Sequence, residues 1–88
     1  MNLINRNIHA LLDCYEFPND SHRFHELVEH TGKPPKTVSE NLRHCIKHGY
    51  IRIVKRVYGI KREINLYILT GKGFTVKAML NRIREETN

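Results

Sequence analysis

Apolar positions follow helical spacing near both ends of the chain and strand-like alternation in the part between them. The first stripe has helical spacing and consists of Ile4, Ile8, Leu11, Leu12 and Tyr15, with Asn2 placed to cap it. Turn-forming residues at 17–21 then predict a break, and Ser21 is expected to cap a short helix over 22–30. Thr31 and Gly32 are expected to end that helix, because glycine readily adopts the left-handed conformation of a helix end.

The middle of the chain predicts a longer amphipathic helix and then a hairpin. Pro35 suits the first turn of a helix, so this helix is predicted over 35–48, ending before Gly49. Its inward stripe is Val38, Leu42, Cys45 and Ile46. β-branched residues over 50–57 and 63–69 predict two strands, with 58–62 as the tip between them. Thr70 is then placed to cap a last helix from Gly71 to Glu85.

This order of helix, helix, helix, hairpin and helix predicts an α+β fold in a single domain over residues 1–88. Four segments carry a family resemblance: Leu27-Val28-Glu29-His30-Thr31-Gly32, Lys36-Thr37-Val38-Ser39-Glu40-Asn41-Leu42, Gly49-Tyr50-Ile51 and Tyr67-Ile68-Leu69-Thr70-Gly71-Lys72-Gly73. In this order and spacing they resemble the small winged helix-turn-helix transcriptional regulators of the MarR, PadR and ArsR type. The resemblance covers residues 22–74 closely.

The resemblance implies a winged helix-turn-helix, with three helices, a two-stranded β-hairpin wing and a C-terminal helix. In that group the Thr-Val-Ser turn, here at 37–39, opens the recognition helix, and a Leu-Thr-x-x-Gly element, here at 69–73, ends the wing. The wing tip at 59–63 departs from MarR proteins, because it lacks their acidic-Arg signature. The chain is also short for a separate ligand-binding domain, so we expect no small-molecule ligand and no cofactor.

Charge is distributed unevenly along the chain and changes the functional expectation. The 88 residues hold 15 Lys and Arg against 9 Asp and Glu, a formal net charge of +6. Residues 1–30 carry 2 basic and 5 acidic side chains, whereas 31–88 carry 13 and 4. Such a positive field predicts a polyanionic partner, nucleic acid first and an anionic membrane second, with a basic face kept for solubility as the simpler alternative. No membrane span or signal peptide is recognisable, so a cytoplasmic protein without a membrane partner is expected.

The outer face of helix 35–48 has the chemistry to read the major groove of duplex DNA. Candidate contacts on this helix and the turn before it are Lys33, Lys36, Thr37, Ser39, Glu40, Arg43 and Lys47. Lys36 and Arg43 suit guanine edges or phosphates, and Lys47 suits a phosphate. Glu40 suits a cytosine amine, or it pairs with a basic neighbour on its own helix. The hairpin adds Arg52, Lys55, Arg56, Lys61 and Arg62, which fit a wing on the backbone or in the minor groove.

Sequence-specific binding of double-stranded DNA by a transcriptional regulator is therefore the predicted function. The first and last helices carry more apolar residues than a small core needs, which predicts a homodimer through Leu3, Ile4, Ile8, Leu11, Val76, Met79, Leu80 and Ile83. The alternative is a winged-helix protein-interaction module in a larger complex, since one fold hosts unrelated functions. An apolar wing would favour the alternative, and one continuous basic surface on helix and wing would favour DNA.

The histidines and cysteines predict no metal site. His44 and His48 stand at i, i+4 with Cys45 between them, a spacing that metal sites can use. Cys45, however, belongs to the inward stripe, and no further Cys/His set completes four ligands. Cys45 is therefore expected in the core, and Cys14 is expected to be free or paired. The sequence has no Gly-rich phosphate loop, nucleophile elbow or paired-acid motif, so we expect no enzyme.

Overall fold

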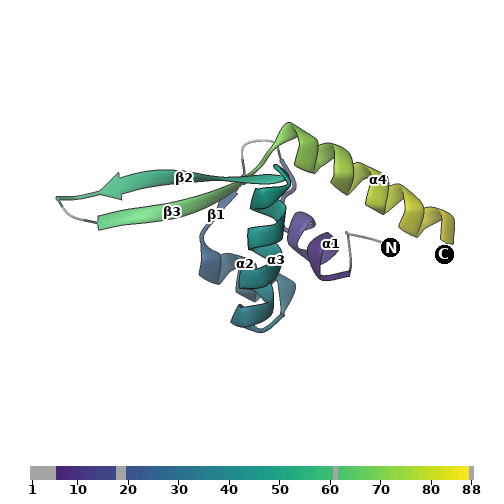
Figure 1. Ribbon diagram of the computed structural model, residues 1–88, viewed down its shortest axis with the longest axis horizontal. Helices are drawn as coiled ribbons and strands as arrows, with labels where there is room; N and C mark the ends of the chain where they lie inside the picture. The colour runs from purple at the N-terminus through teal and green to yellow at the C-terminus, as the bar shows by residue number, and fades with distance from the viewer. Residues whose placement is uncertain (1–5, 18–19, 61, 88) are drawn as a thin grey trace.

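The computed structural model describes residues 6–17, 20–60 and 62–87. In chain order the elements are α1 (Arg6–Leu12), β1 (Ser21–His22), α2 (Phe24–Thr31), α3 (Pro35–Lys47), β2 (Ile51–Tyr58), β3 (Arg62–Leu69) and α4 (Gly71–Thr87). Helices α1, α2 and α3 form the body, and the β2–β3 hairpin and α4 project from it on opposite sides (Figure 1). The predicted order of helix, helix, helix, hairpin and helix is confirmed. The expected start of the first helix, with Asn2 and Ile4, lies outside the described residues.

A short third strand was not predicted, and it changes where the second helix begins. β1 pairs antiparallel with β3 through Ser21 opposite Ile68 and His22 opposite Tyr67, so the sheet order is β1-β3-β2. The prediction that Ser21 caps a helix over 22–30 is therefore wrong, because its backbone belongs to the sheet. Helix α2 starts after Arg23, whose backbone N–H donates to Glu26 Oε1 at 2.8 Å.

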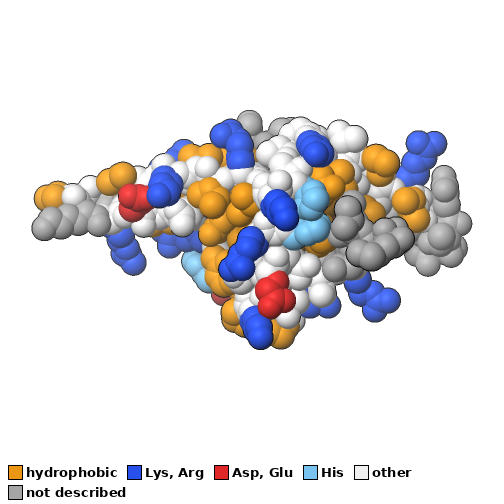
Figure 2. Space-filling model, viewed as in Figure 1, with side chains coloured by type: hydrophobic (Ala, Val, Ile, Leu, Met, Phe, Trp, Pro, Cys, Tyr) orange, Lys and Arg blue, Asp and Glu red, His pale blue; other side chains and the backbone are white. Residues whose placement is uncertain are grey.

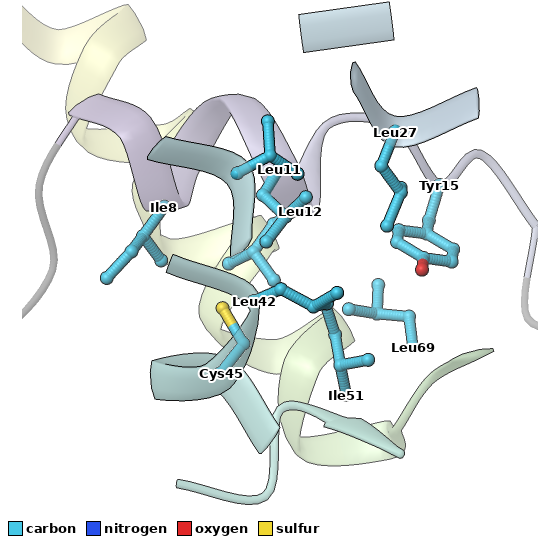
Figure 3. Packing of buried hydrophobic residues seen from close by; sticks show 10 residues of the cluster. Ile8, Leu11, Leu12, Tyr15, Leu27, Leu42, Cys45, Ile51 and Leu69 are labelled. Carbon is cyan, nitrogen blue, oxygen red and sulfur yellow. The ribbon is translucent and has the colours of Figure 1, made fainter. Parts of the chain in front are cut away.

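The core lies where the three body helices meet the base of the hairpin. It is built from Ile8, Leu11, Leu12, Tyr15, Leu27, Val38, Leu42, Cys45, Ile51 and Leu69. In Figure 3, Leu12 of α1 lies beside Leu42 of α3, and Tyr15 lies near Leu27 of α2. The predicted inward stripe of α3 is confirmed, with Cys45 fully buried. Each large aliphatic side chain buried in this way stabilises the fold by roughly 1.5–3 kcal/mol, so the stripe fixes which side of α3 faces outward.

Thr70 fixes the junction between the hairpin and α4, as its predicted capping role requires. Its hydroxyl oxygen accepts the Gly73 N–H at 3.0 Å, which satisfies a donor in the first turn of the helix. The same hydroxyl donates to the Gly49 carbonyl oxygen at 2.6 Å. The Thr70 N–H donates to the Tyr50 carbonyl oxygen at 2.9 Å. The turn after α3 is thus tied directly to the start of α4.

Candidate nucleic-acid interface

The outer side of α3 carries an exposed row of charged residues opposite the buried stripe. Lys36, Glu40, Arg43 and Lys47 are all exposed, as the helical period predicts. Figure 2 looks onto this side of the molecule, where Lys and Arg side chains follow α3 from one end to the other. Among the described residues, none of these four side chains forms an ion pair, so the row keeps a net positive charge. Pairing of Glu40 with a basic neighbour on α3 is not seen.

The smaller polar candidates stand beside this row. Thr37 and Ser39 are half-buried on the two flanks of α3. The Thr37 carbonyl oxygen accepts a hydrogen bond from Asn41 Nδ2 at 2.7 Å, within the helix. Lys33 is half-buried in the turn before α3, and its backbone N–H donates to Thr31 Oγ1 at 3.3 Å. Both hydrogen bonds join residues close together in the sequence and leave the side chains of Thr37 and Lys33 outside them.

The strand register sorts the basic residues of the wing onto two different faces. Successive side chains of a strand point to opposite faces, so Arg52 and Arg56 share one face and Lys55 lies on the other. Arg62 pairs with Tyr58 across the hairpin and therefore shares the face of Arg52 and Arg56. Among the described residues these three arginines form no ion pair. Lys61, the remaining candidate, lies outside the described residues.

The opposite face of the wing is mixed in character. Lys55 Nζ lies 3.1 Å from Glu63 Oε1, so its charge is partly neutralised within the hairpin. Ile53 and Val57 share this face and are 43% and 67% exposed, and Ile60 near the tip is 96% exposed. The wing cations were predicted as one set, but the structure divides them between an arginine face and a mixed face that exposes Ile53 and Val57.

The structure also brings together basic residues that were not among the predicted contacts. Arg23 and His25, at the start of α2, line one open groove together with Arg62 of β3. β1 creates this arrangement, because its pairing with Ile68 and Tyr67 directs the chain into α2 beside the wing. No local periodicity marks Arg23 or His25, so only the sheet topology reveals them.

At the C-terminal end of α3, the rings of two histidines and a tyrosine lie close together beside a lysine. The rings of His44 and His48 have centroids 4.2 Å apart, and the His48 and Tyr50 rings are stacked at 5.9 Å. Lys72 Nζ lies 5.4 Å from the centre of the Tyr50 ring. Desolvation, followed by the nearby His44, Lys47 and Lys72, lowers the pKa of His48, so its imidazole is neutral at pH 7. Lys47 and Lys72 carry the fixed positive charges around His48.

Neither the histidines nor the cysteines assemble a metal site in the part of the chain that the structure describes, where no three candidate ligands converge. Both cysteines are free. Burial raises the pKa of the Cys14 thiol to about 11 and that of Cys45 to about 12, so both are protonated at neutral pH. Of the two outcomes expected for Cys14, the structure shows the unpaired thiol, with Sγ 3.5 Å from the Ala10 carbonyl oxygen.

Known proteins resemble this chain in structure and not in sequence. No family model matches it, and no curated protein matches it by sequence. A structure of BpsR from Bordetella bronchiseptica, described for the regulation of its DNA binding by 6-hydroxynicotinic acid, superposes with a TM-score of 0.78 at 13% identity. The match covers 96% of this chain and 57% of that one, so this chain spans little more than half of BpsR.

Two structures of YodB from B. subtilis are also similar. The diamide-treated form matches with a TM-score of 0.65 at 23% identity, covering 89% of this chain and 70% of that one. The reduced form, named as a transcriptional regulator, gives 0.62 at 22% identity, covering 90% and 71%. The fold is a winged helix-turn-helix. In it α2 and α3 form the helix-turn-helix, and the β2–β3 hairpin is the wing. Within the described residues, no helix has the length and apolar character needed to cross a membrane.

Proposed function

We propose that this chain is a cytoplasmic transcriptional regulator that binds double-stranded DNA through residues 1–88 as one domain. Helix α3 enters the major groove, and the wing lies on the backbone or in the minor groove. The observation that carries the proposal is the exposed and unpaired basic row of α3, on a helix whose other side is anchored in the core. The DNA binding described for BpsR and the regulator role named for YodB agree with it.

Within this proposal the residues have different roles. Lys36 and Arg43 contact guanine edges or phosphates, and Lys47 contacts a phosphate. The shorter polar side chains of the same helix contact base edges (Thr37, Ser39 and Glu40). Lys33, in the turn before α3, contacts the DNA backbone. On the wing, the arginine face supplies the electrostatic contacts (Arg52, Arg56 and Arg62), together with Lys61. Lys55 contributes least, because Glu63 holds its ammonium group.

We further propose a homodimer through α4. The apolar surplus predicted from sequence is smaller than expected, because Ile8 and Leu11 are buried within the protomer. Met79 and Ile83 lie at i, i+4 on α4 and are 58% and 55% exposed. A row of this kind is suited to a symmetric contact with the same row of a second copy. Solution scattering at micromolar concentration tests this: a dimer mass is expected, and a dimer mass that persists in Met79→Glu/Ile83→Glu would contradict a contact through α4.

Salt-dependent binding to a random-sequence duplex tests the main proposal. Each phosphate contact releases counterions and contributes about −0.9 to the slope of log affinity against log salt. Fluorescence anisotropy should therefore give a linear plot whose slope becomes shallower in Arg43→Ala/Lys47→Ala, by roughly 1.8 if both contact phosphate. A matched control, Arg6→Gln/Arg82→Gln, removes the same charge from α1 and α4. Absence of binding at low salt would refute the proposal.

A second candidate function rests on the exposed apolar residues of the wing. Ile53, Val57 and Ile60 are exposed on a hairpin that projects away from the body. Such side chains are typical of a surface that docks a protein. If the wild-type chain fails to bind duplex DNA, these residues make a protein-interaction module the better explanation, and Val57→Lys should then abolish partner capture.

A further inference from the structure

An open groove of about 470 Å³ separates the start of α2 from the outer half of β3. It exists because β1 is so short. β1 pairs with β3 only at Ile68 and Tyr67, after which the chain turns away into α2, so residues 62–66 have no strand partner on that side among the described residues. Tyr67 and Arg62 are five residues apart on an extended strand, so the groove runs for roughly 16 Å.

The groove carries a fixed positive charge at each of its two ends. Arg23 belongs to the turn before α2, and Arg62 to the far end of β3. Among the described residues, neither guanidinium has a carboxylate in ion-pair contact. His25 and Asn65 add hydrogen-bonding groups between the arginines. Tyr67 is half-buried and gives the groove an aromatic wall.

One carboxylate lines this groove, and a second accepts a hydrogen bond from a residue that lines it. Glu63 lines the groove, but its Oε1 lies 3.1 Å from Lys55 Nζ. Glu26 accepts the Arg23 backbone N–H at 2.8 Å, and this hydrogen bond, above all other causes, lowers the pKa of Glu26. Among the residues that line the groove, the two guanidinium groups outnumber the single carboxylate, Glu63, whose charge Lys55 partly neutralises. A chain of phosphodiesters complements this positive charge, because arginine binds phosphate in a bidentate, charge-assisted geometry.

We propose that this groove holds the sugar-phosphate backbone of one strand of the duplex, with Arg23 and Arg62 each bound to a phosphate. The backbone of one strand winds around the duplex, so its successive phosphates lie farther apart than the rise of about 3.4 Å per nucleotide along the axis, and a groove of roughly 16 Å faces about two or three of them. The residues that line the groove come from the start of α2, which belongs to the helix-turn-helix, and from β3 of the hairpin. The protein then contacts the duplex in two places. Helix α3 lies in the major groove of the DNA, and α2 and the wing contact the sugar-phosphate backbone. This inference rests on the proposed function, and it adds α2 to the DNA-binding surface.

The test compares Arg23→Gln/Arg62→Gln with the charge-matched control Arg6→Gln/Arg82→Gln, by anisotropy across a salt series on two unrelated duplexes. Loss of two phosphate contacts should make the salt slope shallower by roughly 1.8 and weaken binding roughly 60-fold at 0.1 M salt. The loss should be equal on both duplexes, because phosphate contacts carry no sequence information. Arg62→Gln alone, on the exposed hairpin, should produce half of the slope change, and circular dichroism checks that each variant is folded.

Several outcomes separate this proposal from the function on which it rests. If the groove variant binds like the wild type, or loses no more than the control, the groove proposal is overturned while DNA binding through α3 stands. If the groove variant loses the two contacts and Arg43→Ala/Lys47→Ala loses nothing, the groove is supported and the role of α3 is overturned. If the wild-type chain binds neither duplex at low salt, both proposals fail together.

Discussion

Replacing Gly73 by alanine tests the junction between the wing and α4, where the neighbouring atoms leave no space for a Cβ atom. A Cβ at this position would lie 2.2 Å from the Tyr50 carbonyl oxygen and 2.5 Å from Leu69 Cδ1. The Tyr50 oxygen cannot easily withdraw, because it accepts the Thr70 N–H at 2.9 Å. Leu69 is a buried member of the core. The added methyl group therefore meets fixed backbone on one side and packed core on the other.

The expected loss follows from this geometry. Non-bonded heavy atoms rest about 3.5 Å apart, so the first turn of α4 must move by roughly 1 Å to accept the Cβ. Overpacking of this kind typically costs about 1–3 kcal/mol in the free energy of unfolding. In a domain of this size, each 1 kcal/mol lowers Tm by roughly 4–8 °C. Gly73→Ala should therefore lower Tm by roughly 4–24 °C.

Thermal unfolding followed by circular dichroism measures the effect, with Gly71→Ala as the matched control in the same helical turn. A Cβ at Gly71 would meet nothing within 4 Å. Removing this glycine should stabilise the fold by about 0.4–1 kcal/mol, because the unfolded chain loses conformational freedom. Equal melting of Gly73→Ala and the wild type would show that the junction is not packed as described. An equal loss in both variants would point to the helix start itself and refute the steric argument.

Three further outcomes are expected. Tyr15→Phe removes the buried hydroxyl that donates to the Tyr67 carbonyl oxygen at 2.8 Å. Urea unfolding should show a loss of roughly 1–3 kcal/mol in the free energy of unfolding, because the carbonyl oxygen is left without its donor. An unchanged free energy would mean that water replaces the hydrogen bond. The pKa of the Cys14 thiol is about 11 against an ordinary 9.0, so its thiolate fraction at pH 8 is small. Cys14 should therefore react with iodoacetamide roughly 100-fold more slowly than a peptide thiol. An equal rate would contradict its burial. The pKa of Glu26 is lowered chiefly by the Arg23 N–H, so its stabilisation is present above the ordinary value of 4.5 and is lost as the pH falls through the lower folded value. Glu26→Gln should therefore lower Tm at pH 7, and the difference from wild type should close in acid; a constant difference would rule out this charge effect.

The elements that rest on one regular period could be predicted from the sequence. The buried stripe of α3, with Val38, Leu42 and Cys45, follows directly from a repeat of three and four residues, and so does the exposed row on its other side. The Leu69-Thr70-x-x-Gly73 element was identified by resemblance, and the structure supplies its physical reason. Thr70 caps the helix, and Gly73 is the residue that lets the helix approach the Tyr50 backbone.

The start of α2 could not be predicted in the same way. Ser21 is a good capping residue by composition, and the local sequence gives no reason to place it in a strand. Its pairing with Ile68 is a contact across 47 positions of the chain, decided by the sheet and not by its neighbours. Once Ser21 is part of the sheet, the capping role passes to Glu26, which accepts the Arg23 N–H.

The wing shows why charge alone does not define a binding surface. Strand alternation already places Arg52 and Lys55 on opposite faces, but only the register assigns Arg62 to the face of Arg52 and sets Glu63 beside Lys55. A one-residue slip would exchange the faces of every side chain on one strand. The same non-local pairing that displaces Ser21 also carries Arg23 to the edge of β3. The extent of the candidate surface therefore depends on two strand pairings, whereas local sequence reveals the exposed row of α3 and the alternation within each strand.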